Sequence, residues 1–210
     1  MIDLYTWGTP NGRKVSIMLE ESGLPYQVHA VNILNNEQFE SDFLKISPNN
    51  KIPAIVDRDN GQSIMESGAI LLYLAEKTGQ LMPAGEARRW QCTEWLMWQM
   101  GGLGPMLGQA HHFLKFNEGK SEYAETRYAE EARRLYQVLN RRLAEAEFLA
   151  EDYSIADIAT WPWISRYEWQ GIDLNDFENV KRWYTTIASR PPVQRGYHQP
   201  RYLNEIPLPA

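Results

Sequence analysis

Short apolar runs alternate with longer amphipathic stretches over residues 1–79 of the chain. Runs with the length and the β-branched or aromatic content of strands lie at residues 3–7, 26–31 and 54–56. A turn and a fourth short strand are expected after the third run. Stretches with helical spacing and helix-start residues span residues 12–22, about 38–46 and 66–79. The predicted order of elements is therefore βαβαββα.

The pattern changes at residues 80–85, where proline and glycine interrupt it and only helical spacing follows. We expect this segment to be a linker, so that residues 1–79 form one domain and residues 86–210 form an all-helical second domain. Helices in the second domain are expected at residues 86 to about 112, 122–146, 155–167 and 179–189. An extended C-terminal tail is predicted from Pro200, Pro207 and Pro209.

Residues 49–77 combine features of a site that binds a peptide head group. Pro53 has no N–H and should mark the start of a strand; if its peptide bond is cis, the Ile52 backbone faces outward and can pair with an extended ligand. Glu66 offers a carboxylate to an ammonium, while Ser67 and the first helical amides offer donors to a carboxylate. Each feature also has an ordinary explanation, as a trans loop proline, a solvated charge or a helix N-cap. Their order along the chain favours a site for one free amino-acid head group.

Composition and charge disfavour several other function classes. The 210 residues carry 21 basic and 27 acidic side chains, a net charge of −6, without long runs of Lys or Arg. Nucleic acid is therefore not an expected partner. The N-terminus has no basic, apolar leader, and no apolar run approaches the roughly 18 residues of a membrane span. We expect a cytoplasmic, soluble protein without a membrane partner.

The chain has a single cysteine, Cys92, which excludes an internal disulfide and a CxxC redox pair. Any thiol chemistry must then come from a bound molecule, and Cys92 is interpreted as a buried apolar residue. His111 and His112 point about 100° apart on a helix and have no Cys or carboxylate at ligand spacing, so no metal site is predicted. The run Ser154-Ile155-Ala156-Asp157 is typical of a capping box with a structural role.

Four glycines and a proline interrupt the helix expected at residues 86–112, at Gly101, Gly102, Gly104, Pro105 and Gly108. A glycine costs roughly 1 kcal/mol inside a helix and a proline about 3. Such a cost predicts the close approach of a dimer partner's helix or of a ligand. Tryptophans at helical spacings, predicted to pack in the core or between domains, are Trp90, Trp95, Trp98, Trp161, Trp163 and Trp183.

The element order, with Ile-Pro before the third strand and Glu-Ser before the third helix, resembles the glutathione-binding domain of glutathione S-transferases. Within that superfamily, the chain resembles the Nu-class bacterial disulfide-bond oxidoreductases, whose fungal relative is a prion-forming nitrogen regulator. The segments that carry this resemblance are SPNNKIPAIVD, ESGAILLYLAEKTG, WQMGGLGPMLGQAHHF and YSIADIATWPW. The resemblance implies an α/β thioredoxin-like domain with a mixed four-stranded sheet, followed by an all-α domain. It also implies a homodimer with the helices at 86–112 and 122–146 in its interface.

Members of this family place a side chain from the first strand or the following turn near the glutathione sulfur. Here the turn offers Thr9 and Asn11, which the resemblance implies as the catalytic residues. Thr9 also caps a helix that has Pro10 in its first turn. A thiol at a helix N-terminus has a lowered pKa, and the thiolate is the active species. Tyr5 is a competing candidate, although strand alternation places it on the face of Asp3.

The resemblance assigns the other parts of glutathione to further residues. Besides Asn11 at the sulfur, the implied contacts are Ile52 for the cysteinyl unit, Glu66 and Ser67 for the γ-glutamyl head, Gln38 and Lys51 for the glycyl carboxylate, and Arg127 for a second glutathione. Without the resemblance, Lys51 is a solvated loop charge and Gln38 a helix-start residue. Arg127 would then be a surface residue paired with Glu130 or Glu131.

The predicted function is disulfide reduction by thiol–disulfide exchange, with two bound glutathiones or one oxidised glutathione and no protein cysteine. The expected substrate is a small disulfide. One alternative is a transferase that conjugates glutathione to a small electrophile in an aromatic-rich cleft beside Trp7, His112, Phe113 and Phe116. The other alternative is a non-catalytic regulatory protein that keeps the glutathione site and acts through partners.

Overall fold

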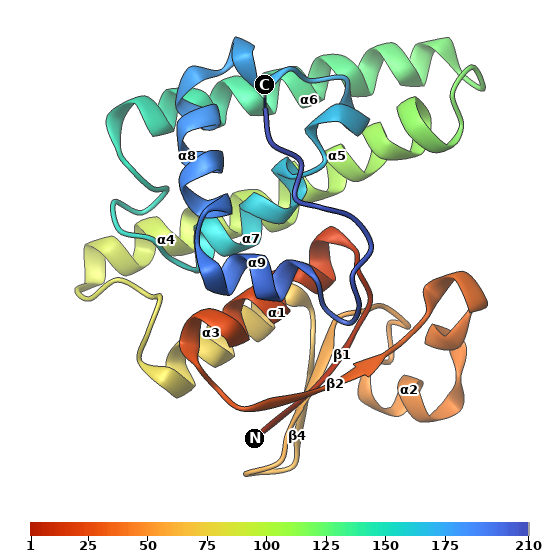
Figure 1. Cartoon of the computed structure of the whole chain (residues 1–210), viewed down its shortest axis with the longest axis vertical. Coiled ribbons are helices and arrows are strands. Elements are labelled where there is room, and N and C mark those ends of the chain that lie inside the picture. The colour runs from red at the N-terminus through yellow and green to blue at the C-terminus, as the bar shows by residue number, and fades with distance from the viewer. Residues whose placement is uncertain (210) are drawn as a thin grey trace. The chain divides into compact units, whose positions relative to one another are not determined.

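The structure, a computed structural model, describes residues 1–209 and divides the chain into two compact units (Figure 1). Unit 1 contains Met1–Met82 and Ser189–Ile206, and unit 2 contains Pro83–Ala188 and the described residues from Pro207 onward. The first division falls within the expected linker, where Pro83 and Gly85 interrupt the helices. On the C-terminal side the grouping differs from the expected span of 86–210, because Ser189–Ile206 packs with the first unit.

Unit 1 is built on a mixed four-stranded sheet in the order β2-β1-β3-β4. Its strands are β1 Ile2–Thr6, β2 Tyr26–Ala30, β3 Ala54–Asp57 and β4 Gln62–Met65. Strand β1 is parallel to β2 and antiparallel to β3, and β3 is antiparallel to β4. The predicted mixed sheet and its βαβαββα order are confirmed.

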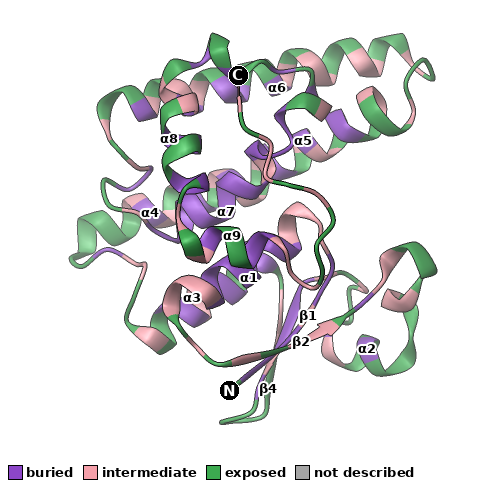
Figure 2. Cartoon of the chain, viewed as in Figure 1, coloured by how far each residue is buried: buried purple, intermediate pink, exposed green. Residues whose placement is uncertain are grey.

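Helices cover both faces of this sheet (Figure 1). They are α1 Pro10–Ser22, α2 Ser41–Ile46 and α3 Ser67–Thr78, while α9 Pro191–Tyr197, near the end of the chain, packs on α1. Ile2 and Leu4 point to one face and are fully buried, since residues two apart in a strand share a face. Tyr5 points to the other face, where it packs with Val31 and Phe43 of the α2 side. Most of α1, residues 12–19, is buried (Figure 2).

One local prediction for unit 1 is wrong and one helix was missed. The helix expected from Gln38 to Ile46 is a 3-10 turn, Glu37–Phe39, followed by α2, because Glu40 has extended backbone angles (φ −65°, ψ 140°). The helix α9, by contrast, was not predicted; residues 200–209 after it, where an extended tail is expected, contain no helix or strand. Pro191 and Pro192 occupy the first positions of α9, where a missing N–H costs nothing.

Unit 2 is helical throughout its main elements. These are α4 Glu86–Trp98, α5 Gly104–Ala110, α6 Glu122–Glu145, α7 Ile155–Ile164 and α8 Glu178–Ala188. The expected single helix at 86–112 includes two π-helical turns, Gln99–Leu103, which contains Gly101 and Gly102, and His111–Phe116. The two-part fold, a thioredoxin-like domain and a helical domain, is therefore as predicted.

The glycines of α5 make room for a side chain of the same chain. A Cβ on Gly104 or Gly108 would lie 3.5 or 3.4 Å from the Trp163 ring, whereas a Cβ on Gly101 would meet nothing within 4 Å. The distances to Trp163 are ordinary van der Waals distances, whereas the Gln99 Nε2 would lie only 2.6 Å from a Cβ on Gly104. The close approach of a partner's helix or of a ligand at these glycines stays a prediction.

The capping box at the start of α7 is confirmed. Ser154 caps the helix, and Asp157 accepts hydrogen bonds from the Ser154 N–H (3.0 Å) and from the Trp183 indole (2.9 Å). Burial raises the pKa of Asp157 to about 6 against the opposing effect of these donors. Trp161 and Trp183 are fully buried as expected, but Trp90 on α4 is 63% exposed and does not belong to the core.

Candidate functional site

The turn that follows β1 presents the N-terminus of α1. Thr9 is the N-cap, and its hydroxyl accepts a hydrogen bond from the Gly12 N–H at 3.3 Å; Pro10 and Asn11 form the start of the helix. A Cβ at Gly12 would lie 2.1 Å from the Trp7 carbonyl oxygen, so only glycine lets the helix start this close to the strand. Thr9 and Asn11 remain partly exposed. The turn therefore offers a hydroxyl, an amide and the positive end of a helix dipole to a ligand.

The loop before β3 supplies backbone groups. The Ile52–Pro53 peptide bond is cis, and within residues 1–209 neither the N–H nor the C=O of Ile52 has a hydrogen-bond partner. A hydrogen bond within the loop stabilises its conformation: the Ser47 hydroxyl donates to the Lys51 carbonyl at 2.8 Å. The Lys51 side chain is exposed. These features meet the condition under which Ile52 was expected to pair with an extended ligand.

Glu66 occupies an unusual backbone conformation at the start of α3. Its φ of 69° and ψ of 114° place a non-glycine residue in a sparsely populated region, at a cost of about 1–3 kcal/mol. Glu66 is the N-cap residue but makes no side-chain cap, and its carboxylate is exposed, whereas Ser67 is 4% exposed. Strain of this kind concentrates at ligand sites, and here it holds a free carboxylate beside a helix N-terminus.

Strand register brings these segments to one edge of the sheet. Tyr5 pairs with Ala54 in the β1–β3 ladder, and Ala54 pairs with Met65 in the β3–β4 ladder. The Thr9 turn, the Ile52 loop and Glu66 each lie only a few residues beyond these paired positions. The first glutathione-site residues expected from the sequence, apart from Gln38 and Lys51, are thus placed at the same end of three neighbouring strands.

A buried lysine links the two helix starts, and sequence reasoning missed it. Lys14 of α1 is 1% exposed, and its ammonium donates to the Ser67 hydroxyl at 3.2 Å. Burial lowers the pKa of Lys14 to about 7, and the charge of Glu66 opposes this shift. From the sequence alone, a lysine in an amphipathic helix is expected to be exposed to solvent. The only indication of a role for Lys14 is its position five residues after Thr9, near the start of the helix that contributes to the site.

Gln38 carries an unsatisfied polar atom. It lies in the 3-10 turn Glu37–Phe39, and its Oε1 is buried without a hydrogen-bond partner among residues 1–209. Buried amide oxygens are normally paired, so this atom has the capacity to accept a donor from a ligand. Together with the open Ile52 backbone, it makes the described residues of unit 1 a fit for a small peptide such as glutathione.

Arg127 lies in unit 2, near the start of α6. It is exposed and lines an open hollow of about 510 Å³ that also includes Met106, Tyr123 and Arg134. The ion pair considered with Glu130 or Glu131 is not formed: Glu131 pairs instead with Arg134 at 2.7 Å, and no described residue forms an ion pair with Arg127. Its guanidinium is available to an anionic ligand.

The competing candidates are held in structural roles. Cys92 is fully buried, and burial raises the pKa of its thiol. Tyr5 stacks on His29 with ring centroids 4.6 Å apart. The buried His111 ring lies 2.9 Å from the Gln170 amide, and burial lowers its pKa to about 4. Among residues 1–209, no group of three or more His, Cys, Asp or Glu side chains could hold a metal ion.

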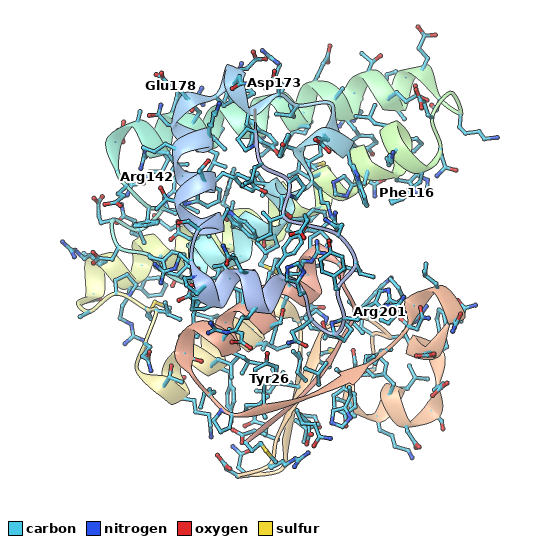
Figure 3. All side chains as sticks on the ribbon, in the orientation of Figure 1. Tyr26, Phe116, Arg142, Asp173, Glu178 and Arg201 are labelled. Atoms are coloured by element: carbon cyan, nitrogen blue, oxygen red, sulfur yellow. The ribbon has the colours of Figure 1, made fainter. Side chains whose placement is uncertain are left out.

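The aromatic residues of the alternative electrophile site come from both units. Trp7 is 8% exposed and belongs to unit 1. In unit 2, Phe113 stacks on Tyr128 with centroids 5.5 Å apart. Phe116, which is labelled in Figure 3, is an exposed side chain of the same unit. No helix within residues 1–209 has the length and apolar character needed to cross a membrane.

Comparison with known proteins agrees with this geometry. The family models described as the glutathione S-transferase N-terminal and C-terminal domains match residues 1–76 and 103–191. The disulfide-bond oxidoreductase YfcG of Escherichia coli is 52% identical over 197 residues, which cover 91% of this chain and 92% of that protein.

Two solved structures are similar over nearly the whole chain. A glutathione transferase from Pseudomonas putida, with one glutathione disulfide bound per subunit, has a TM-score of 0.90 and 46% identity, covering 95% of this chain and 91% of that one. A glutathione transferase from Burkholderia graminis, with two glutathione molecules bound per subunit, has a TM-score of 0.89 and 46% identity, covering 95% and 88%. With both domain models matched and this level of identity, the chain belongs to the glutathione S-transferase family.

Proposed function

We propose that this glutathione-dependent enzyme reduces small disulfides by thiol–disulfide exchange, using two glutathiones and no cysteine of its own. The proposal depends on one observation: the residues suited to stabilise a thiolate lie in unit 1, whereas the cysteine of the chain is buried in unit 2. The helix start at Thr9 and Asn11 is built to stabilise a thiolate, whereas Cys92 lies buried in unit 2 with a raised pKa. The names of YfcG and of the glutathione-bound transferases support this choice within the family.

The proposed reaction consumes glutathione as a reductant. The thiolate of one glutathione attacks a sulfur of the substrate disulfide, forming a mixed disulfide and releasing the first substrate thiolate, which takes up a proton. The second glutathione attacks the glutathione sulfur of the mixed disulfide, releasing the other substrate thiol and leaving oxidised glutathione. Two electrons pass from the two thiols to the substrate, so the step needs no other reductant.

Residues of unit 1 would hold the first glutathione. Glu66 and Ser67 would bind the γ-glutamyl head, with Lys14 supporting the Ser67 hydroxyl from below. The Ile52 backbone would pair with the cysteinyl unit, which aims the sulfur at Thr9 and Asn11. The glycyl carboxylate would meet two further residues, Gln38 and Lys51. The protein thereby supplies proximity and a lowered thiol pKa.

The second glutathione is assigned to Arg127, whose guanidinium has no ion pair among the described residues. A charge-assisted hydrogen bond contributes roughly 1.5–3 kcal/mol, so Arg127→Ala should weaken the second ligand by about 10- to 150-fold and leave the first unchanged. Arg134→Ala is the matched control, because Arg134 lines the same hollow but is already paired with Glu131. Calorimetry with reduced and oxidised glutathione would measure both sites.

A pair of assays tests the function itself. The enzyme should reduce bis(2-hydroxyethyl) disulfide with glutathione and should leave a chlorinated nitroaromatic unreacted. Turnover of the nitroaromatic alone would favour a conjugating transferase, and turnover of neither substrate would favour a glutathione-binding regulatory protein. Saturation at one glutathione per chain would contradict the two-glutathione mechanism.

Family membership also suggests a homodimer, and α4 offers exposed apolar side chains for an interface. Trp90 is 63% and Met97 48% exposed. Sedimentation should give about twice the 24.4 kDa chain mass, and Trp90→Glu should shift the mass toward one chain.

A reaction that consumes reduced glutathione also suits the reducing cytoplasm.

A further inference from the structure

The last helix is fixed along α1, so the end of the chain belongs to unit 1. A Cβ at Gly196 would lie 2.6 Å from the Ile17 Cα, and the Ser16 hydroxyl donates to the Gly196 carbonyl at 2.7 Å. Two ion pairs at 2.7 and 2.6 Å further join the two helices, Arg190 with Glu21 and Arg195 with Glu20. The residues that follow α9 therefore start from a defined place on the surface of α1.

Arg13 anchors the next segment to the first turns of α1. Its guanidinium carbon lies 3.5 Å from the centroid of the Tyr197 ring, and its Nε donates to the Tyr197 carbonyl at 3.1 Å. Asn204 accepts from Arg13 at 3.4 Å and donates to the Tyr197 hydroxyl at 3.0 Å. Since the Arg13 N–H itself bonds to the Thr9 carbonyl at 3.0 Å, these contacts hold the segment beside the N-cap.

Two side chains of this segment lie against the residues that lead into Thr9. The Cδ1 atom of Leu203 is 2.3 Å from the position that a Cβ would occupy on Gly8. Consecutive Cα atoms are about 3.8 Å apart, so Leu203 lies within about 8 Å of the Thr9 Cα. The Arg201 guanidinium carbon lies 4.7 Å from the centroid of the Trp7 ring.

Three side chains of this segment are exposed to solvent. Leu203 is 41% exposed, Tyr202 is 57% exposed, and Arg201 is also exposed. No described carboxylate forms an ion pair with Arg201. Arg201 and Leu203 thus lie against Trp7 and Gly8, which lead into Thr9, while the neighbouring Tyr202 ring stacks on His198 with centroids 4.9 Å apart. None of the three is needed to bind the first glutathione.

We propose that Arg201, Tyr202 and Leu203, here called the C-terminal wall, select the disulfide substrate. The wall would favour small disulfides that carry carboxylates, because Arg201 attracts the carboxylate while Tyr202 and Leu203 contact the carbon chain and limit its size. The inference rests on the proposed function, since it takes the reacting sulfur to lie at Thr9 and Asn11. The wall residues are specificity determinants and have no part in the thiol exchange itself.

Charge selection is tested with three small disulfides: dithiodiglycolate, which is anionic, bis(2-hydroxyethyl) disulfide, which is neutral, and cystamine, which is cationic. Arg201→Gln should lower kcat/KM for the anionic disulfide by about 3- to 10-fold, as expected for one charge pair near the surface. The neutral disulfide should change less than about 2-fold, and glutathione affinity should stay the same. Arg141→Gln, which removes an exposed arginine of α6, is the control.

Size selection is tested with a bulkier dicarboxylate, 2,2′-dithiodibenzoate, compared with dithiodiglycolate. Leu203→Ala should raise the kcat/KM ratio of the bulky to the small disulfide by about 3-fold or more, because a branched side chain is removed from the wall. Leu208→Ala, which truncates another exposed leucine near the chain end, should leave the ratio unchanged.

A double-mutant cycle establishes that the wall acts through its contact with Gly8. Gly8→Ala should displace the Leu203 side chain and change the size ratio, because the new Cβ would overlap Cδ1. In the Leu203→Ala background the same change should have little further effect, which gives a non-additive cycle.

The outcomes separate the inference from the proposed function. Unchanged charge and size ratios in Arg201→Gln and Leu203→Ala, with the parent active on disulfides, would overturn the wall and leave the disulfide reductase in place. No turnover of any disulfide by the parent would overturn the proposed function and the wall with it.

Discussion

Asn11 lies in the first turn of α1, two residues after the N-cap Thr9, at the end of the helix that favours negative charge. An amide at this place should act on the developing thiolate more than on the bound ligand. Asn11→Ala should therefore lower kcat by about 10- to 100-fold while the glutathione Kd changes by less than about 3-fold. Steady-state turnover assays measure the change in kcat, and calorimetry measures the change in the glutathione Kd.

The control for Asn11 is Asn175→Ala in unit 2, a polar deletion outside the site. An unchanged kcat in Asn11→Ala would transfer the thiolate-stabilising role to Thr9 or to the backbone amides. Equal losses in kcat and affinity would mean that Asn11 only binds the ligand.

Cys92 is the residue whose removal should matter least to turnover. It is fully buried in α4, and burial raises the pKa of its thiol, so it is neither accessible nor ionised near neutral pH. Cys92→Ser should keep disulfide reductase turnover within a few-fold of the parent, measured at equal concentrations of folded protein. Complete loss of turnover in a variant with an unchanged circular dichroism spectrum would contradict the cysteine-free cycle.

At the scale of elements, the junction of β1 with α1 depends on Gly12. An added Cβ would lie 2.1 Å from the Trp7 carbonyl oxygen and 2.5 Å from the Thr6 hydroxyl oxygen, and backbone atoms cannot move aside cheaply. Gly12→Ala should therefore lower the free energy of unfolding by about 2 kcal/mol or more, a cost typical of overpacking. Urea unfolding measures this change.

Gly101→Ala is the matched control for Gly12. Its Cβ would meet nothing within 4 Å, and its φ is not in the left-handed region. This change should be neutral or stabilise the protein by up to about 1 kcal/mol, since alanine is the better helix former. A Gly12→Ala variant as stable as Gly101→Ala would contradict the close junction.

The sequence predicted helices and strands best where the signals were local. Thr9 with Pro10 and the Ser154–Asp157 box cap helices as expected. Prediction failed where backbone angles changed without a strong breaker, as at Glu40, and where prolines started a helix, as at Pro191. A proline reads equally well as the first residue of a helix or as part of an extended tail, and only the packing of α9 on α1 decides.

At the scale of the whole molecule, acid stability should depend on the first strand. Asp3 is mostly buried and accepts hydrogen bonds from Arg58 and His29, and the Arg58 bond holds its pKa down, at about 2. A carboxylate with a lowered folded-state pKa stabilises the fold above its unfolded pKa and loses this contribution as pH falls. Unfolding free energy should thus drop by about 1–2 kcal/mol between about pH 4 and pH 2, after allowance for the exposure of Arg58.

Asp3→Asn should remove this part of the pH dependence, so the stabilities of parent and variant should converge near pH 2. Asp42→Asn is the control, because Asp42 pairs with Lys45 on an 89% exposed surface site. Parallel stability curves for the parent and Asp3→Asn across this range would show that Asp3 is not the responsible group.

The amino-acid sequence by itself determined the βαβαββα order, the helical second part, the caps and the positions of Thr9, Ile52 and Glu66 at element boundaries. These depend on local backbone preferences and on the spacing of apolar residues, which a single sequence displays. It also indicated that no cysteine pair serves the chemistry.

Only the tertiary structure decided which polar residues are buried and which apolar ones are exposed. From the sequence, the charged side chains of Arg13 and Lys14 are expected to be exposed, yet each is only 1% exposed. Trp90 is expected in the core, yet it is 63% exposed. The ring of Tyr197 from α9 covers Arg13, and a helix pattern cannot show which distant element covers it. The C-terminal wall arises in the same way, since Leu203 meets Gly8 only because α9 returns the chain to α1.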